Sequence, residues 1–255
     1  MPKIAMTFHA LPLRFLCRHL MRRLKINELD PFARASFSQE GEDLILSRFL
    51  EPRTKGWYVD IGAHHPKRFS NTYYFYLRGW AGLNIDAMPG SMDKFNRLRP
   101  RDINIEVAVA EQENVRSYFV FNDTALNTFN SSLAEERKKL APYYITDTIP
   151  VKCRRLDSIL EEYLPENKHI DFMSVDAEGL DLEVLRSNDW LRFRPEFLVV
   201  ECLDLNSPDV HENTVIQFLT EKDYSMAARC FNSVIFRTEV PPVACPNLAG
   251  PKPIE

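Results

Sequence analysis

The sequence lacks several patterns that would assign a protein class at once. None of its 5 cysteines lies in a CxxC pair, and no His/Cys spacing suggests a zinc site. No apolar run reaches the roughly 18 residues that a membrane-spanning helix needs. Arginines interrupt residues 10–24, which argues against a cleaved signal peptide. Together these absences predict a reducing, cytoplasmic compartment.

A glycine-rich phosphate-binding loop is also absent. Residues 60–66 read DIGAHHP and contain one glycine, where a dinucleotide site would have GxGxxG. A pyrophosphate therefore fits poorly, because no glycines clear a helix N-terminus for it. A nucleoside ligand without phosphates fits better.

Acidic residues are missing from the first 25 positions, although the whole chain has a net charge of −4. A basic N-terminal arm on an acidic body is not typical of a nucleic-acid-binding protein. Residues 11–26 predict a basic amphipathic helix. It could dock on an anionic membrane surface; packing on its own domain or on a partner subunit, including a second copy of the chain, is the favoured alternative. We divide the chain into this arm (1–35), a main domain (36–239) and a proline-rich tail (240–255).

Strand-like and helix-like segments alternate from residue 36 onward, which indicates an α/β fold with a mostly parallel sheet. Residues 115–122 predict an extra, more exposed strand, and 123–149 an insertion of the kind that often forms a lid. The expected strands are 56–62, 81–87, 103–110, 169–179 with its turn, 196–204, 224–230 and 232–238, the last two antiparallel to each other. The expected helices are 36–50 with Ser38 as its cap, 70–79, 89–100, 131–140, 153–164, 180–188 and 210–222.

Acidic side chains follow the apolar strands at their carboxyl ends, where ligands bind in such sheets. They are Asp60, Asp86, Asp176 with Glu178, and Glu201. Because burying several like charges together is costly, we predict a functional cluster. Asp86 ends the second strand of a βαβ unit, where an acid can accept hydrogen bonds from a ribose. S-adenosylmethionine, a phosphate-free cationic nucleoside, suits such a site.

The chain resembles the FkbM family of S-adenosylmethionine-dependent methyltransferases. The resemblance rests on WYVDIGAHHP, FSNTYYFYLRGWAGLNIDAMPGS, ALNTF and IDFMSVDAEGLDLEVL, and runs from residue 38 to residue 236. It implies a class I methyltransferase (Rossmann-like) fold, a three-layer sandwich whose seven-stranded, mostly parallel sheet has an antiparallel last strand. It also implies methylation of a hydroxyl, often on a sugar or polyketide-type product, and relatives often have surface-polysaccharide functions. We predict a hydroxyl of a sugar or glycoconjugate, such as a surface polysaccharide, as the acceptor. An inactive binding protein of the same fold and a nucleotide-sugar oxidoreductase are the alternatives.

The resemblance also assigns the cofactor site. It implies that Asp60, Gly62 and Ala63 form the cofactor loop and that Asp86 binds the ribose. It places adenine beside Ala108 to Ala110, and it turns Asp176 and Glu178, the D-x-E-G motif, toward the methyl donor. Many methyltransferases have glycines where this chain has His64 and Pro66. We add Gln39, His64 and Ala87 as cofactor contacts.

The acceptor and the general base are assigned from residue chemistry. We favour His65 as the base over His64, Glu178 and Asp176, because imidazole titrates near neutral pH; the alternative is that the histidines cap their own turn. Asn127, Thr128 and Glu201 are candidate acceptor contacts, although the 127–128 pair could instead bond its own backbone. Asp176 and Glu178, with Glu201 nearby, could bind magnesium or calcium.

Overall fold

The computed structural model describes residues 33–202 and 213–240. The described residues from Ser36 onward belong to one compact unit. The predicted helix at 11–26 and nearly all of the proline-rich tail lie outside the described residues. Among the residues that are described, no helix is both long and apolar enough to cross a bilayer.

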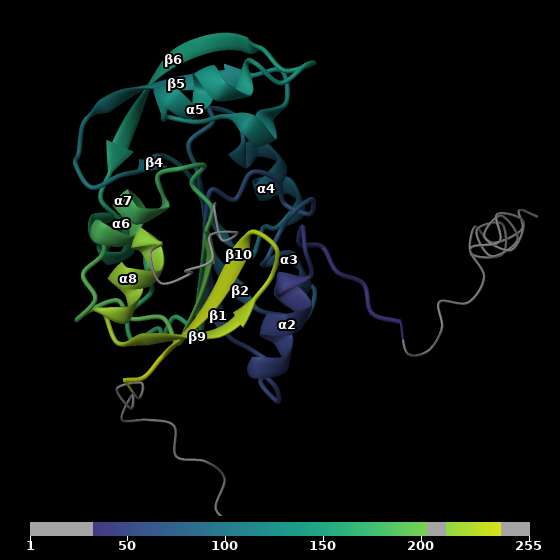
Figure 1. Ribbon diagram of the computed structural model, residues 1–255. Helices are drawn as coiled ribbons and strands as arrows, with labels where there is room; N and C mark the ends of the chain where they lie inside the picture. Colours follow the sequence, from purple (N-terminus) through teal and green to yellow (C-terminus); the bar gives the residue numbers. More distant parts are fainter. Residues whose placement is uncertain (1–32, 203–212, 241–255) are drawn as a thin grey trace, which may run out of the picture. The chain divides into compact units, whose positions relative to one another are not determined.

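The main sheet of the described residues has seven strands in the order β3-β2-β1-β7-β8-β10-β9 (Figure 1). Neighbouring strands run parallel from β3 to β8, and β10 is antiparallel to both β8 and β9. This arrangement confirms the predicted class I methyltransferase fold. The strands are β1 (Trp57–Ile61), β2 (Ala81–Asp86), β3 (Ile103–Glu106), β7 (Phe172–Val175), β8 (Phe197–Glu201), β9 (Tyr224–Arg229) and β10 (Ser233–Thr238).

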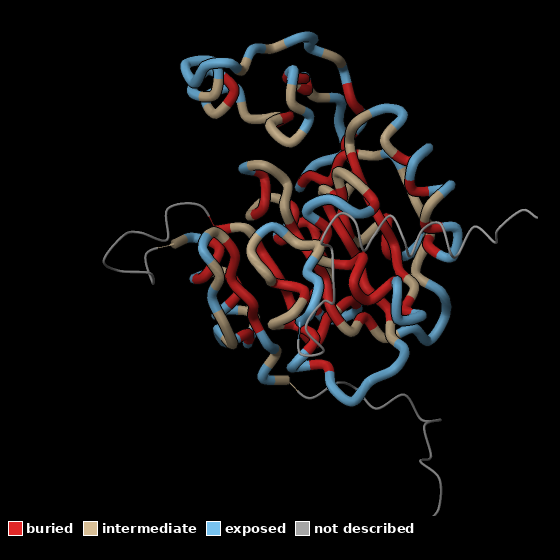
Figure 2. The backbone as a smooth tube through the Cα atoms, turned by 90° about the vertical axis from the view of Figure 1, so that its right-hand side faces the viewer, coloured by how far each residue is buried: buried red, intermediate tan, exposed pale blue. Residues whose placement is uncertain are grey.

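Helices cover both faces of this sheet, and the central strands between them are buried (Figures 1 and 2). Alternate residues of a strand point to opposite faces: Val59 and Ile61 of β1 pack in one core, and Tyr58 packs in the other. Burial on both faces explains why the strands read as continuous apolar runs. One layer contains α2 (Glu42–Phe49), α3 (Tyr73–Tyr76) and α4 (Met92–Leu98), and the other α6 (Leu156–Tyr163), α7 (Asp181–Arg186) and α8 (Thr214–Thr220).

The predicted start of the first helix was wrong. The helix begins at Glu42, and its N-cap is Gly41 with φ 90° rather than Ser38. Ser38 still serves this helix end, because its hydroxyl accepts the N–H of Gly41 (3.1 Å) and donates to the Asp43 carboxylate (3.0 Å).

A second, three-stranded sheet in the described residues corrects two further predictions. It contains β4 (Ala108–Val109), β6 (Ile145–Arg154) and β5 (Val115–Phe121), in that order. The predicted strand 103–110 divides at Val107, because β3 is an edge strand and the following residues pair with β6 instead. The predicted insertion contains a 3-10 turn, η1 (Thr124–Leu126), and helix α5 (Ser131–Arg137). It ends in strand β6, which was not predicted. Because β6 extends to Arg154, α6 begins at Leu156 rather than at the predicted residue 153.

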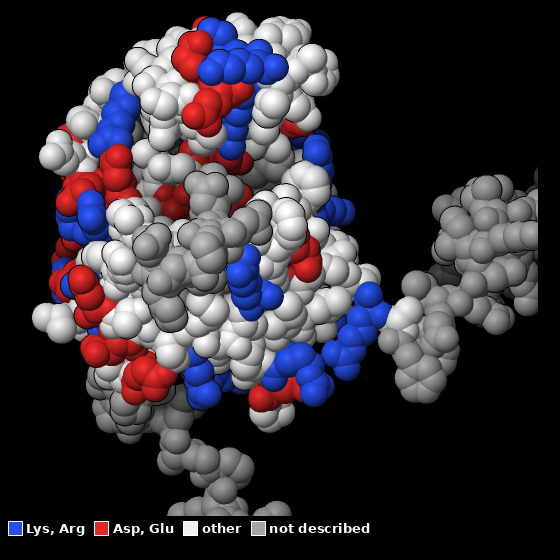
Figure 3. Space-filling model, viewed as in Figure 1, with Lys and Arg blue, Asp and Glu red and all other residues white. Residues whose placement is uncertain are grey.

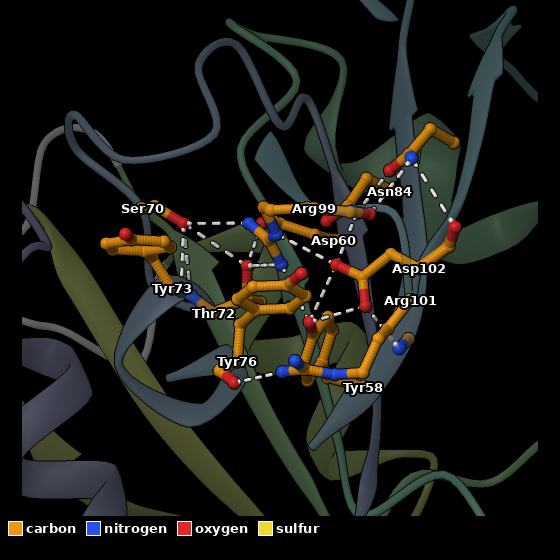
Figure 4. Close-up of polar contacts among 12 residues, drawn as sticks. Tyr58, Asp60, Ser70, Thr72, Tyr73, Tyr76, Asn84, Arg99, Arg101 and Asp102 are labelled. Atoms are coloured by element: carbon orange, nitrogen blue, oxygen red, sulfur yellow. Dashed lines mark hydrogen bonds and ion pairs between the residues drawn. The ribbon is translucent and has the colours of Figure 1, made fainter. Parts of the chain in front are cut away.

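A buried polar network fastens β1 to its neighbours on the α3 side of the sheet (Figure 4). Arg99 and Asp102 form an ion pair (2.8 Å) between side chains that are both 0 % exposed. Asp102 also accepts the hydroxyl of Tyr58 (2.8 Å) and the N–H of Gly82 (3.1 Å). Arg99 donates to the Thr72 hydroxyl (2.9 Å), which in turn donates to Asp60 (2.6 Å).

Arg99→Met is expected to lower the free energy of unfolding by about 3 kcal/mol, since it leaves Asp102 as a buried carboxylate without its cation. Urea unfolding followed by circular dichroism measures the change. The matched control is Arg192→Met, whose ion pair with Glu161 is exposed (51 % and 64 %) and should contribute less than about 1 kcal/mol. Equal losses in the two variants would contradict the structural role of the network.

Candidate active site

A cavity of about 400 Å³ lies at the carboxyl ends of β1, β2, β7 and β8 and is closed on one side by residues of β5, η1 and α5. The space-filling view shows acidic side chains in the hollow between the β5–β6 part of the molecule and the main sheet (Figure 3). In α/β sheets, ligands commonly bind at the carboxyl ends of the strands, where the strand order reverses.

Gly62 forms the turn that leaves β1. Its φ is 76°, a left-handed conformation that favours glycine. Its N–H and that of Ala63 both donate to the carbonyl of Ile85 (3.0 Å each), which ties the turn to the end of β2. A Cβ atom at Gly62 would come within 1.8 Å of the Asp176 carbonyl oxygen. The close approach of the β1 and β7 ends therefore depends on this glycine.

Asp86 lines the cavity at the end of β2 and is 8 % exposed. Its carboxylate accepts the N–H groups of His64 and Met88, at 2.8 Å each and one per oxygen. Burial raises the pKa of Asp86, and these two donors act against that rise. Since each carboxylate oxygen can accept a second bond, the fixed carboxylate keeps acceptor capacity for a ligand diol.

An apolar wall adjoins Asp86. Ala108 and Val109 of β4, Tyr118 of β5 and Phe129 line this side of the cavity, with Ala87 beside them. The rings of Tyr118 and Phe129 pack on each other with centroids 4.4 Å apart. A flat heterocycle such as adenine fits a wall of this composition.

Three carboxyl groups gather on the opposite side of the cavity. Asp176, Glu178 and Glu201 each offer an oxygen, and these oxygens lie within 4.8 Å of one another. Burial and the neighbouring acids, chiefly Glu201, raise the pKa of Asp176 well above its usual value. Burial and the charges of Glu178 and Asp181 raise the pKa of Glu201 to about 8. At neutral pH Glu201 is therefore largely protonated.

Among these acids, Glu201 is the one whose charge acts most strongly on Asp176. Oδ1 of Asp176 and Oε2 of Glu201 are both buried and have no hydrogen-bond partner within the described part of the chain. A buried polar atom without a partner is costly. One proton shared between the two carboxyl groups would satisfy both oxygens.

Two side chains from the insertion hold Glu178. Arg137 of α5 makes an ion pair with its carboxylate, and the Thr128 hydroxyl donates to its carbonyl oxygen (2.8 Å). Glu178 has φ 52°, an unusual backbone conformation for a residue with a side chain. Burial raises the pKa of Glu178, and Arg137 opposes that rise. Glu178 is therefore the acid of the three that is best stabilised as an anion.

Comparison with known proteins assigns the family. The model of the methyltransferase FkbM domain matches residues 60–226, more than half of the chain. The chain belongs to the FkbM methyltransferase family. The methyltransferase assignment made from the sequence is thereby confirmed, and the match supports S-adenosylmethionine as the methyl donor. No curated protein is significantly similar to the chain.

Solved structures with a similar arrangement are distant in sequence. A TehB-like SAM-dependent methyltransferase from Corynebacterium glutamicum has a TM-score of 0.39 and 10 % identity, over 88 % of this chain and 97 % of that one. An O-methyltransferase from Bacillus cereus in complex with SAH has a TM-score of 0.36 and 12 % identity, over 88 % and 87 %. Neither likeness is close enough to indicate an acceptor.

The structure brings together most of the residues predicted for the site of this FkbM-family protein. The predicted residues in the cavity wall are Gln39, Gly62, His64, Asp86, Ala87, Ala108, Asn127, Asp176, Glu178 and Glu201. Their individual roles remain predictions. Asn127 is 3 % exposed and its amide oxygen accepts the N–H of Phe121 (2.8 Å), so it also anchors the insertion to β5.

Asp60 and Ala63 are not in the wall of the cavity, although both were predicted to form the cofactor loop. Asp60 lies inside β1, one residue before its end, and accepts from Thr72 in the Arg99 network. Burial raises the pKa of Asp60. Ala63 packs on Met92 and Phe95 of α4. Both residues thus contact the structure behind the turn that leaves β1 rather than the cavity.

His65 and Thr128 also lie outside the wall of the cavity. Nδ1 of His65 accepts the N–H groups of Lys67 (3.1 Å) and Arg68 (3.0 Å), so the ring caps its own turn. That geometry does not support His65 as the base and agrees with the alternative reading of the histidines. Thr128 is 1 % exposed, and its hydroxyl donates a hydrogen bond to the carbonyl oxygen of Glu178.

Three residues that were not predicted from the sequence also line the cavity: Arg137, Phe69 and Asn232. Arg137 lies in the charged helical piece of the insertion, where lysines and arginines are abundant and none stands out. Phe69 and Asn232 lie in loops, and only the three-dimensional fold brings them beside β7 and β8.

Proposed function

We propose that this FkbM-family protein transfers a methyl group from S-adenosylmethionine to a hydroxyl of a sugar or glycoconjugate. The observation that carries the proposal is the carboxyl group cluster of Asp176, Glu178 and Glu201 in the wall of the cavity. A sugar hydroxyl is weakly acidic and must lose its proton as it attacks, so an O-methyltransferase needs a base nearby.

The cavity fits the donor in three ways. Asp86 presents a carboxylate with spare acceptor capacity to the ribose. The wall of Ala108, Val109 and Phe129 accepts adenine. The acidic group at the ends of β7 and β8 complements a positive sulfonium.

S-adenosylmethionine supplies an electrophilic methyl group on its sulfonium sulfur. This chain's residues then have two tasks: to align the acceptor oxygen with that carbon and to take the hydroxyl proton. The Asp176–Glu201 pair, when ionised, accepts the proton as the oxygen–carbon bond forms and the carbon–sulfur bond breaks. The products are a methyl ether, the neutral demethylated cofactor and a protonated carboxyl pair.

A second mechanism would use the same three acids as ligands of a magnesium ion, as their 4.8 Å grouping allows. The ion would then lower the pKa of the acceptor hydroxyl. Methyl transfer measured with EDTA, and again after magnesium is restored, separates the two mechanisms.

The function is tested with labelled cofactor and a panel of glycans, read by mass spectrometry. Gain of one methyl group on a glycan hydroxyl supports it. Binding of S-adenosylmethionine without transfer to any glycan would favour a binding protein of the same fold. Titration with NAD, which we expect not to bind, tests the oxidoreductase alternative.

Asp86→Asn should weaken the binding of the demethylated cofactor about 30-fold, because the amide has no charge and replaces one of the two acceptor oxygens with an NH2 donor. Isothermal titration measures the dissociation constant. Asp93→Asn on the exposed side of α4 is the matched control and should leave the constant unchanged. If Asp86→Asn binds the demethylated cofactor with the dissociation constant of the wild type, Asp86 does not contact the cofactor.

A further inference from the structure

Phe69 is an unusual residue in the wall of the cavity. It is a large apolar side chain that is 44 % exposed, and it lines both the main cavity and a smaller one of about 20 Å³. The two cavities share Gln39, Asp176, Glu201 and Asn232 as well. Phe69 therefore lies beside the carboxyl pair proposed as the base, where the acceptor must bind.

The backbone at Phe69 does not favour a bulky residue. Its φ is 56°, which is a genuine outlier for phenylalanine. Unusual conformations of this kind persist when the surroundings enforce them, and they concentrate at ligand sites. Here His65 caps the preceding turn, and the N–H of Ser70 donates to the carbonyl of Phe37 (2.9 Å). The backbone at Phe69 is therefore held on both sides, although burial gives its ring little stabilisation.

The groups around the ring match the two kinds of surface on a pyranose. The Arg68 guanidinium lies over one face of the ring, with its carbon 4.4 Å from the centroid. The exposed remainder of the ring offers an apolar surface for the C–H face of a sugar. Gln39 and Asn232 bring amide groups, which can both donate to and accept from hydroxyls. The smaller cavity has room for about one water-sized group, such as a single hydroxyl.

We propose that Phe69 is the stacking platform of a glycosyl-acceptor subsite, with Gln39 and Asn232 binding the hydroxyls of the same ring. This proposal rests on the proposed function, because it assigns the acceptor of that reaction. It predicts that Phe69 contributes to the binding of the acceptor and not to the binding of the cofactor.

The test compares Phe69→Ala, Phe69→Trp and the control Phe231→Ala. Phe231 is 72 % exposed and lies next to Asn232 but outside both cavities. The probes are methyl pyranosides. Their binding is followed by saturation-transfer NMR with and without the demethylated cofactor, and their turnover with labelled S-adenosylmethionine. Isothermal titration of the demethylated cofactor gives its dissociation constant in each variant.

Phe69→Ala should weaken pyranoside binding, or raise KM, about ten-fold. The dissociation constant of the demethylated cofactor should change less than about two-fold, Phe69→Trp should restore pyranoside binding, and Phe231→Ala should match the wild type. Weaker cofactor binding in Phe69→Ala would overturn the proposal, and so would the absence of pyranoside binding to the wild type. Pyranoside binding without methyl transfer would uphold the subsite and contradict the proposed function instead.

Discussion

Gly62→Ala is expected to abolish cofactor binding and to lower the free energy of unfolding by more than about 4 kcal/mol. The added Cβ would lie 1.8 Å from the carbonyl oxygen of Asp176, and that oxygen belongs to backbone. A flexible side chain could turn away, but here the end of β7 must move. The same end carries Asp176, one acid of the proposed base, so the displacement reaches the catalytic pair as well.

A matched control separates this steric effect from the cost of a left-handed alanine. Gly79 also has a positive φ (90°), but a Cβ there would meet nothing within 4 Å. Gly79→Ala should therefore cost only about 1–2 kcal/mol and leave cofactor binding intact. Thermal unfolding and isothermal titration of both variants make the comparison. If the two variants behave alike, the contact between the β1 turn and β7 does not control the site.

The main sheet could be predicted because each of its strands carries its own signal. The central strand β8 reads FLVVE with its first four residues fully buried, as a strand covered on both faces should. The strand β6 was missed because Pro150 interrupts a pattern that otherwise alternates through Ile149, Val151 and Cys153. A proline argues against a strand interior, and only the pairing with β5 and β4 shows that this one is tolerated.

The acids at the strand ends predicted the position of the site, but one of them, Asp60, does not line the cavity. Asp86 and Glu201 are the last residues of their strands and Asp176 follows its strand directly, so all three reach the cavity. Asp60 is one residue further inside its strand, on the same side as Tyr58, and there it meets the Arg99 network. One position along a strand decides whether an acid faces a ligand or supports the core. His65, the predicted base, lies outside the cavity wall for a different reason: Nδ1 of its ring caps the tight turn.

The long-range contacts of the site could not be predicted. Arg137 meets Glu178 across 41 positions of the sequence, and no local pattern relates a charged helix in an insertion to an acid after β7. Phe69 and Asn232 are brought together by the sheet order, because β10 inserts beside β8. Such contacts follow from topology rather than from the composition of either segment.

Glu201→Gln is expected to lower kcat by about 10²–10³-fold, because it removes one acid of the pair that takes the acceptor proton. The pKa of Glu201 is raised to about 8, and only the ionised carboxylate acts as a base. The kcat/KM of the wild type should therefore rise with pH and level off above about 8. In the variant, Asp176 loses the negative charge that helps to raise its pKa, so the remaining activity should level off at a lower pH. Methyl transfer measured from pH 6 to 10 checks both profiles.

The same substitution should stabilise the protein at high pH. Glu201 has a higher pKa in the folded state, about 8, than its ordinary 4.5, so between these values the folded protein binds more protons than the unfolded chain. Stability contributed by the protonated group is complete below about pH 4.5 and is lost as the pH rises through about 8. Glutamine does not ionise, so the variant should melt above the wild type at pH 9 and close to it at pH 4. The control Glu161→Gln, in an exposed ion pair, should change neither activity nor this pH dependence. Lower stability of Glu201→Gln at pH 9, with activity retained, would mean that Glu201 is an ordinary structural carboxylate and that the proton goes elsewhere.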